Sequence, residues 1–478
     1  MKEQILNANL IKKYHQDLVF NYSEYPTKDH WKFEFKNDEY KQALIEWFPN
    51  NQDKKIFFYV HIPFCEQLCW FCTCSKYISK DYARVKDYLI YLYKEIDLLF
   101  EHLNKNNIKL NVGTVFFGGG SPTILSKEDL KDLVDKLKGL FDWSNVENFT
   151  VESDPRRVDE ERLIYNHEIC GTNRISFGMQ DLDPEVQRRV NRIQPAKLFE
   201  DILTPRVRKM YNEIAFDLLI GQPGQTIESM AKTCDEMIKL QPTLVQLSLM
   251  AYKPWVAKYQ VQMLAEGPLP DFLERKEMLE VIHNKLSEGG YIRTGFECYS
   301  LPDSPMTKAF NEGDAHYGAS GHQTGGRVNF IAVGSSSMSN LGNDYYAQNF
   351  YDISSYKKKL DSGELPVFRG MKLSDDDKIR QHATQQFRSY FGIGGMFNLN
   401  ISINNTEAGS VQLNSLTIDS TNWQGEYFDF IPVSLTAVPN EGYEFSSWQG
   451  TINQANSNAI LTTSQNASVQ AIFVPIED

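Results

Sequence analysis

Short apolar runs alternate with longer amphipathic stretches between residues 55 and 252. Apolar runs predict six strands, at residues 56–62, 114–117, 148–154, 174–180, 214–220 and 245–252. The segments between them have helical periodicity, most clearly at residues 82–103. This alternation predicts βα units around a parallel sheet, either an open doubly wound sheet or an incomplete barrel. In both folds, ligands bind beyond the carboxyl ends of the strands.

Two further regions follow these strands. The first, residues 254–392, is expected to be a mixed and mostly helical extension, with helices at 273–288 and 375–390. From residue 389 onward the chain has no Lys, Arg or His, and alternating Val, Ile and Phe predict a small all-β module. We therefore expect four parts. They are an N-terminal segment (1–55), a partial (βα)6 TIM-like barrel (56–253), the mixed α/β extension (254–392) and the β-rich module (393–478), with residues 392–395 as the hinge.

Charge and apolar content narrow the class of protein. The 478 residues include 49 Lys and Arg against 62 Asp and Glu, a formal net charge of -13. Bulk binding of nucleic acid or of an anionic membrane is therefore not expected. No apolar run reaches the roughly 18 residues of a membrane span, and residues 1–28 lack the apolar centre of a signal peptide. We expect a cytoplasmic protein without a membrane span.

Four of the seven cysteines lie close together, directly after the first predicted strand. Cys65, Cys69, Cys72 and Cys74 share one short loop, which indicates metal or redox chemistry rather than disulfides. Three interpretations fit: a 4Fe-4S cluster held by three thiolates, a structural zinc site using all four, or reactive thiols. Structural zinc sites use ligand pairs on two separated loops, and no second pair is visible, so the cluster is favoured.

Other short motifs lie on the predicted strands or follow them along the chain. They are YVHIPFC at 59–65, FGGGSPT at 117–123, VESDP at 151–155, GMQD at 178–181 and VNR at 190–192. Together with the Cys-x3-Cys-x2-Cys spacing, they resemble the radical S-adenosylmethionine (SAM) superfamily. Within it, the chain resembles the oxygen-independent coproporphyrinogen III oxidase family from about residue 22 to about residue 390.

The resemblance implies roles for individual residues. Cys65, Cys69 and Cys72 would hold a 4Fe-4S cluster whose open iron is chelated by SAM, and Cys74 would not be a ligand. The positions that contact this SAM are occupied by Tyr59, Gly119 and Glu152. The positions that hold a second SAM are occupied by Phe71, Gly120, Ser121, Gln180, Arg192 and Asp217. The alternatives are an ion pair of Glu152 with Arg156 or Arg174, and a structural salt bridge of Asp217.

The resemblance also implies a reaction, the oxidative decarboxylation of coproporphyrinogen III propionates to vinyl groups, giving protoporphyrinogen IX. It implies a monomer that uses an external electron donor and acceptor, with residues 1–55 on the substrate side. Candidate donors to the propionates are Arg192, Arg293, Arg327 and Lys253. Two alternatives remain: a radical methyltransferase of the same family that uses its second SAM on another small molecule, and a non-catalytic haem-handling relative.

Two regions depart from the family pattern. GFECY at 295–299 stands where a Met-Asp-His-Phe sequence is usual, and GHQTGG at 321–326 replaces a Thr-Thr-Gln-Gly segment. The substrate side therefore departs more than the cofactor side. The family continues into a helical C-terminal domain, whereas residues 409–413 and 433–448 resemble a β-repeat of secreted bacterial proteins, of the internalin B-repeat type. We expect a borrowed domain or a gene fusion there.

Overall fold

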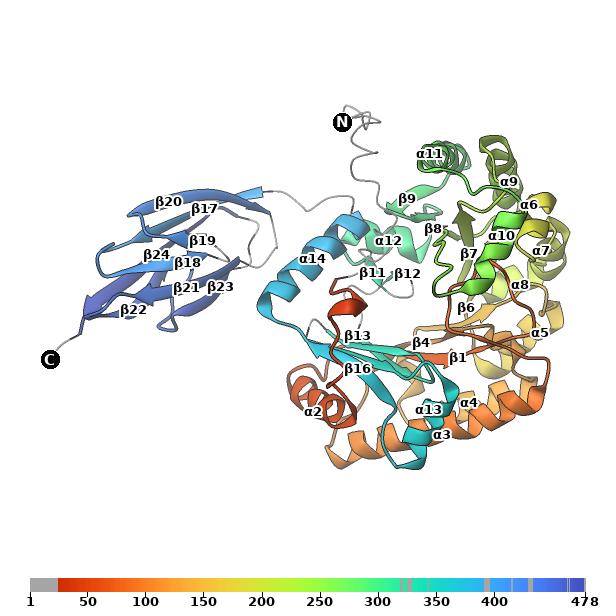
Figure 1. Cartoon of the computed structure of the whole chain (residues 1–478), viewed down its shortest axis with the longest axis horizontal. Helices are drawn as coiled ribbons and strands as arrows, with labels where there is room; N and C mark the ends of the chain where they lie inside the picture. The colour runs from red at the N-terminus through yellow and green to blue at the C-terminus, as the bar shows by residue number, and fades with distance from the viewer. Residues whose placement is uncertain are drawn as a thin grey trace. The chain divides into compact units, whose positions relative to one another are not determined.

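The computed structural model describes residues 25–318, 321–324, 329–342, 344–390, 396–413, 416–428, 433–461, 463 and 465–476. The chain divides into two compact units (Figure 1). The larger contains Thr27–Lys372, and the smaller contains Leu373–Asp478. The hinge expected at residues 392–395 lies outside the described residues. Among the helices described, none combines the length and the apolar character needed to cross a bilayer.

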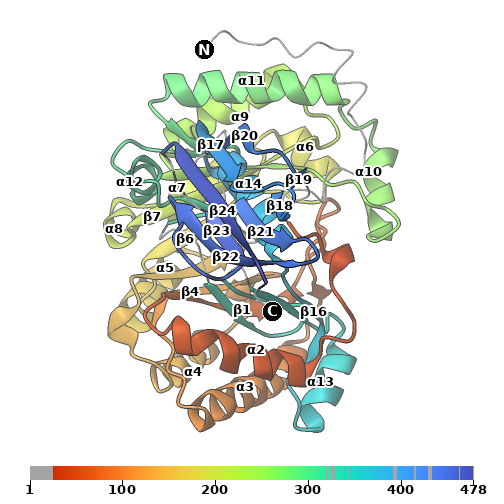
Figure 2. The ribbon, with the colours of Figure 1, turned by 90° about the vertical axis from the view of Figure 1, so that its left-hand side faces the viewer.

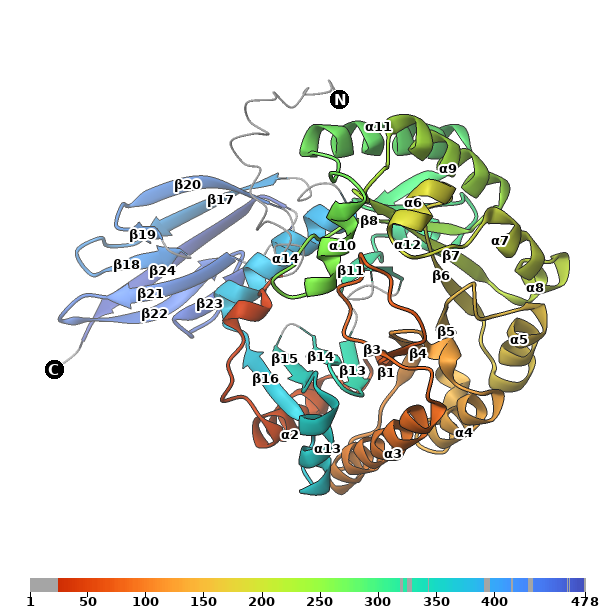
Figure 3. The ribbon, with the colours of Figure 1, turned by 45° about the vertical axis from the view of Figure 1, so that its right-hand side comes forward.

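The larger unit is built on a twelve-stranded sheet. Six neighbouring strands are parallel and follow chain order: β1 (Ile56–Ile62), β4 (Val112–Gly119), β5 (Asn148–Ser153), β6 (Arg174–Gln180), β7 (Glu213–Ile220) and β8 (Leu244–Leu249). They confirm the six predicted strands, whose ends shift by a few residues. Figure 3 shows these strands as an arc with helices along its outer side. The fold is therefore the expected partial barrel.

Helices connect the parallel strands and cover the outer face of the arc. They are α3 (Tyr82–Lys105), α4 (Lys127–Lys138), α5 (Glu160–Tyr165), α6 (Pro184–Arg189), α7 (Ala196–Ile202), α8 (Pro205–Met210) and α9 (Ile227–Lys239). The predicted helix at 82–103 is confirmed as α3, which begins after Asp81, whose side chain accepts from the Ala83 N–H. Its apolar face is buried against the sheet because Leu89, Leu92 and Ile96 recur at helical spacing.

The extension is mixed α/β as expected, and it contains strands that the sequence pattern did not predict. β13 (Asn329–Val333) pairs in parallel with β1, and three antiparallel strands continue that edge. These are β14 (Met338–Leu341), β15 (Tyr345–Asn349) and β16 (Val367–Lys372). At the other edge, β10 (Cys298–Ser300) pairs with β8, and β9 (Ile292–Gly295) pairs with β10. A separate hairpin consists of β11 (His316–Gly318) and β12 (Gly321–Gln323).

The helices of the extension and of the N-terminal segment complete the larger unit. They are α2 (Asn37–Trp47), α10 (Val261–Ala265), α11 (Phe272–Glu288), α12 (Pro305–Glu312) and α13 (Ile353–Asp361). The predicted helix at 273–288 is confirmed as α11, which packs against α9. Both α2 and α13 pack against α3 (Figure 2).

The smaller unit contains α14 (Asp375–Tyr390), which confirms the helix predicted there, and the expected all-β module. One four-stranded sheet has β20 (Asn422–Phe428), β17 (Met396–Ile403), β24 (Ala467–Pro475) and β22 (Tyr443–Gly450) in that order. The other has β19 (Leu416–Ile418), β18 (Gly409–Leu413), β21 (Val433–Pro439) and β23 (Asn458–Leu461). Buried Leu399, Val411, Trp448 and Val469 belong to the module's own hydrophobic core.

A buried carboxylate ties α3 to the strands added beside β1. Glu95 is 3 % exposed and accepts hydrogen bonds from Tyr356 Oη (2.6 Å), the Gly334 N–H (2.7 Å) and Asn349 Nδ2 (2.6 Å). Burial raises the pKa of Glu95 from its ordinary value of 4.5 to about 7, and these hydrogen bonds only partly offset the effect.

This carboxylate should make the stability of the barrel depend on pH. The folded state holds the Glu95 proton more tightly than the unfolded state, so its contribution is complete below pH 4.5 and is lost as pH rises through about 7. The thermal midpoint of wild type, relative to Glu95→Gln, should therefore fall between pH 5 and pH 8. An exposed change on the same helix, Glu101→Gln, should follow wild type. Parallel profiles of wild type and Glu95→Gln would contradict this.

Candidate active site

The loop with the four cysteines begins at the carboxyl end of β1. Its two ends are held together by a short parallel pair, β2 (Phe64–Cys65) and β3 (Tyr77–Ile78). Its middle is fixed to the segment after α6, since the Trp70 N–H donates to the Val190 carbonyl (3.0 Å) and Asn191 Nδ2 donates to the Leu68 carbonyl (2.7 Å). The cysteines are all free of disulfides, so their thiols are available as ligands.

The carboxyl ends of the parallel strands surround a cavity of about 200 Å³. Its lining includes almost the whole predicted set: Cys65, Cys69, Cys72, Phe71, Gly119, Gly120, Ser121, Glu152, Gln180, Arg192 and Asp217. These residues come from the cysteine loop, from β4, β5, β6 and β7 or the residues just after them, and from the segment after α6, and they are up to 152 positions apart in the chain (65 to 217). Cys74 also lines this cavity, and Tyr59 does not.

Tyr59 and Glu152 flank Gly118 at the carboxyl end of β4. A Cβ on Gly118 would come within 2.9 Å of Tyr59 Oη and 3.0 Å of Glu152 Oε2, so this close arrangement needs a glycine. Glu152 accepts from the Gly119 N–H (3.1 Å), and burial raises its pKa to about 8. The alternative of an ion pair for Glu152 was wrong.

The two arginines of that alternative have other partners. Arg156 Nη2 lies 2.7 Å from Asp154 Oδ2, and Arg174 pairs with the buried Glu213. Glu152 is therefore a partly buried carboxylate facing the cavity without a cationic side chain among its described ion-pair partners.

Asp217 on β7 is a second partly buried carboxylate of the cavity. It accepts from Ser176 Oγ at 3.5 Å, and burial raises its pKa to about 6. The described residues form no salt bridge to Asp217, so the structural alternative was wrong for this residue as well. Two partly buried carboxylates facing one cavity favour a ligand that carries positive charge and hydroxyl donors.

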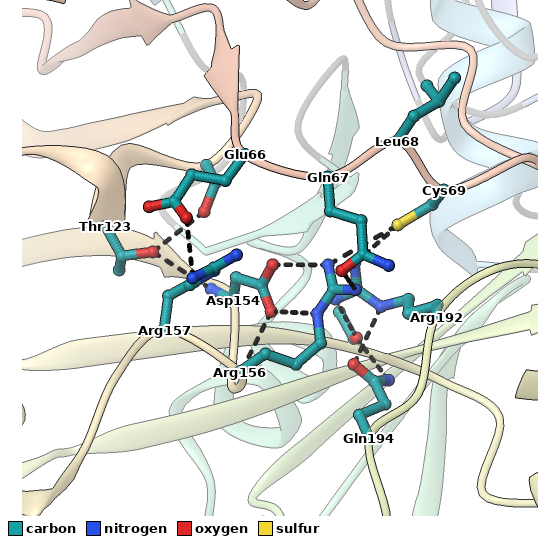
Figure 4. A network of polar contacts seen from close by, with 12 residues as sticks. Glu66, Gln67, Leu68, Cys69, Thr123, Asp154, Arg156, Arg157, Arg192 and Gln194 are labelled. Carbon is teal, nitrogen blue, oxygen red and sulfur yellow. Dashed lines mark hydrogen bonds and ion pairs between the residues drawn. The ribbon is translucent and has the colours of Figure 1, made fainter. Parts of the chain in front are cut away.

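Two arginines converge on Cys69 (Figure 4). Arg192 Nη1 lies 3.4 Å from Cys69 Sγ, and Arg156 Nη2 lies 3.7 Å from the same sulfur. Asp154 holds Arg156, while the Gly178 carbonyl (2.7 Å) and Gln194 Oε1 (2.9 Å) hold Arg192. Guanidinium N–H groups at this distance can donate hydrogen bonds to the sulfur and so restrict its position. Sequence reasoning missed Arg156 and Asp154 here, although the VESDP motif pointed to this strand end.

The chemistry of these groups fits an iron–sulfur cluster with SAM. Three soft thiols from one loop reach one cavity, cationic groups adjoin a sulfur, and the buried carboxylates match the ammonium and ribose hydroxyls of SAM. Members of the radical SAM superfamily use these two cofactors, and the chain is predicted to use both.

The candidate propionate donors do not all meet at this cavity. Arg192 lines it, whereas Arg293 on β9 donates to the Phe296 carbonyl (2.8 Å) and is absent from the lining. Lys253 follows β8 and is also absent from the lining, and Arg327 lies outside the described residues. The cofactor side of the site is therefore assembled more completely than the substrate side.

Comparisons with known proteins agree with this geometry. The family model described as the Radical SAM superfamily matches residues 59–237, and that of the divergent InlB B-repeat domain matches residues 399–477. The oxygen-independent coproporphyrinogen III oxidase of Pseudomonas aeruginosa is 35% identical over 336 residues, which cover 70% of this chain and 72% of the relative. The Escherichia coli enzyme is 30% identical over 372 residues, 78% of this chain and 79% of the relative.

A solved structure supports the same assignment. Coproporphyrinogen III oxidase from Escherichia coli, described as a radical SAM enzyme, matches with a TM-score of 0.71 and 29% identity. The match covers 80% of this chain and 84% of that chain. The resemblance in the motifs is confirmed, and the chain belongs to the oxygen-independent coproporphyrinogen III oxidase family of the radical SAM superfamily.

Proposed function

We propose that this protein catalyses the oxygen-independent oxidative decarboxylation of coproporphyrinogen III to protoporphyrinogen IX. The observation that carries the proposal is the 35% identity with the Pseudomonas aeruginosa oxidase over 70% of the chain. The cavity supports it, because three cysteines and two carboxylates that match the family's motifs line one space. The enzyme is then an oxidoreductase of haem biosynthesis.

The roles of the site residues follow from their contacts. Cys65, Cys69 and Cys72 would hold the cluster, which with SAM supplies a carbon radical that takes a hydrogen atom from a propionate β-carbon. Loss of CO2 and of one electron to an external acceptor then leaves the vinyl group. Glu152, placed by the Gly119 N–H, would bind the ammonium or ribose hydroxyls of SAM. Tyr59, whose hydroxyl is held by His61 Nδ1 (3.1 Å), would contact the same SAM.

We further propose that a second SAM binds in the same cavity. Supporting residues there are Phe71, Gly120, Ser121, Gln180, Arg192 and Asp217, which line it together. Asp217 would accept hydrogen bonds from this molecule, and Arg192 would bind its carboxylate while adjoining Cys69. Gly120 is needed because a Cβ there would approach the Phe64 carbonyl oxygen to 2.7 Å.

The setting proposed for the enzyme is a monomer in the cytoplasm, with a separate electron donor and acceptor. Support comes from the seven free cysteines, since a reducing compartment keeps thiols available and protects an iron–sulfur cluster. The four-part domain division remains a prediction. Along the chain, the boundary between the two compact units falls after Lys372 and not at residue 392.

Anaerobic incubation of the iron-reconstituted protein with SAM, a reductant and coproporphyrinogen III tests the reaction. Mass spectrometry should detect the successive loss of two CO2 from the tetrapyrrole. Formation of S-adenosylhomocysteine with an unchanged tetrapyrrole would instead identify a methyltransferase. Tight tetrapyrrole or haem binding without product would identify a carrier.

A further inference from the structure

The segment that follows β8 reaches across to the cysteine loop. Gln260 is fully buried, and its Nε2 donates to the carbonyls of Phe71 (2.9 Å) and Ala251 (2.9 Å). Its Oε1 accepts from the Lys253 N–H (2.6 Å), so one amide side chain joins three backbone groups. The neighbouring Tyr259 Oη donates to the Cys72 carbonyl (2.5 Å).

Lys76 completes this contact from within the cysteine loop. Its Nζ donates to the carbonyls of Cys72 (3.0 Å) and Cys74 (3.3 Å) and to Tyr259 Oη (2.5 Å). The same Nζ lies 4.8 Å from the centroid of the Tyr259 ring, and Lys76 lines the cavity. The Cys72 carbonyl therefore accepts from two side chains, one on each side of the contact.

We infer that Gln260, Tyr259 and Lys76 are positioning residues that fix the backbone of Phe71 and Cys72. This inference rests on the proposed function, because it takes Cys72 as a ligand of the cluster. A peptide unit whose carbonyl is held by two donors cannot rotate without breaking both hydrogen bonds. The direction of the Cys72 side chain is thereby set before any metal binds.

The contact also links the two ends of the parallel array. The cysteine loop follows β1, the first of the six parallel strands, whereas Tyr259 and Gln260 follow β8, the last of them. Because the arc is open, its sheet hydrogen bonds do not join these strand ends directly. The side-chain contact instead joins these two strand ends, on the side of the sheet where the cavity lies.

Lys76 has an electrostatic role in addition. An ammonium group beside a cluster that becomes more negative on reduction stabilises the reduced form and raises the reduction potential. Lys76→Met should therefore shift the midpoint potential to a more negative value, whereas Lys76→Arg, which keeps the charge, should restore most of it. Lys76→Gln, which keeps donors without the charge, separates the two roles: it should shift the potential as Lys76→Met does, whereas a purely structural lysine would be rescued by Gln as well as by Arg.

Two pairs of variants test the positioning role. Tyr259→Phe removes one phenol-to-carbonyl hydrogen bond, and Tyr291→Phe removes a similar one, from Tyr291 Oη to the Pro242 carbonyl (2.7 Å), away from the cysteine loop. Gln260→Leu removes a buried amide bridge. Gln225→Leu removes another, since Gln225 donates to the Leu219 carbonyl (2.8 Å) and accepts from the Gly221 N–H (2.7 Å).

The readout is the rate at which the reconstituted protein loses iron to a chelator without oxygen, together with the electron paramagnetic resonance spectrum of the reduced cluster. Tyr259→Phe should lose iron roughly fivefold faster than wild type, the factor expected for one lost hydrogen bond, and Gln260→Leu, which removes three, should lose it at least as fast. Their spectra should also change. Tyr291→Phe and Gln225→Leu should match wild type in both measurements, even where they lower the thermal midpoint.

The outcomes separate this inference from the proposed function. If wild type holds a cluster and cleaves SAM, but the loop-contact variants lose iron no faster than their controls, the positioning role is overturned alone. If wild type assembles no cluster under conditions that load other radical SAM enzymes, both the inference and the proposed function are wrong.

Discussion

Cys72→Ser is expected to give a folded protein that retains no stable four-iron cluster and cleaves no SAM. Cys65, Cys69 and Cys72 line one cavity, and each would bind a separate iron, so loss of one thiolate exposes an iron to water and exchange. A serine hydroxyl of similar size does not replace it, because a hard oxygen donor binds iron–sulfur clusters poorly. Iron and sulfide content per chain, with 5′-deoxyadenosine formation, measure the effect.

Cys74→Ser is the matched control, two positions further along the same loop. Cys74 lines the cavity as well, so its substitution tests whether proximity alone makes a ligand. The variant should keep its iron and most of its SAM cleavage. Equal loss of metal in Cys72→Ser and Cys74→Ser would favour a site that uses all four thiols, as a structural zinc site would.

Glu152→Gln is the second substitution with a large expected effect. The variant keeps the size of the side chain and can still accept from the Gly119 N–H, but it cannot ionise when a cation binds in the cavity. The ion pair with the ammonium of SAM is then replaced by a weaker hydrogen bond from the ammonium to a neutral amide oxygen. We expect the Kd of SAM to rise roughly tenfold or more, and 5′-deoxyadenosine formation to fall at least as much.

The control for this change is Glu147→Gln, at the opposite end of the same strand. Glu147 forms an exposed ion pair with Lys55 at 2.5 Å, and neither residue lines the cysteine-bearing cavity. That variant should bind SAM as wild type does, since exposed ion pairs contribute little. Isothermal titration of SAM into the reconstituted proteins gives the comparison, and equal affinities for all three proteins would refute the role of Glu152.

The six parallel strands could be predicted because each is a long buried apolar run between amphipathic helices. The added strands could not, for a physical reason. β14 has only four residues and includes the polar Ser339 and Asn340, and it forms by pairing with β13 and β15 rather than through its own pattern. Such strands depend on a partner distant in the chain, and periodicity does not reveal the partner.

The site residues also include some that could be predicted from the sequence and some that could not. The cysteines and Glu152 stand in short motifs directly after strands, so their position in the sequence already indicated the site. Gln260 belongs to no such motif, and its role depends on a contact 189 positions away, at the Phe71 carbonyl. A single sequence carries no signal for that pairing. The same holds for Arg156, whose approach to Cys69 follows from the fold of two separate loops.

The architecture of the β-module could be predicted from the sequence, but its function could not. Alternating Val, Ile and Phe predicted a small all-β module, and the described strands β17 to β24 form two sheets around a core of their own. The match to the InlB B-repeat family covers residues 399–477, outside the Radical SAM match. A chain ending before residue 391 should therefore retain the cysteine-bearing cavity, whose lining lies entirely within the larger unit.

The most direct measurement of the central claim uses coproporphyrinogen III deuterated at the propionate β-carbons, incubated with the reconstituted protein, SAM and a reductant without oxygen. The account predicts that deuterium from the substrate appears in 5′-deoxyadenosine and that each decarboxylated propionate yields one CO2. Formation of 5′-deoxyadenosine without deuterium, with the tetrapyrrole unchanged, would contradict decarboxylation of this substrate.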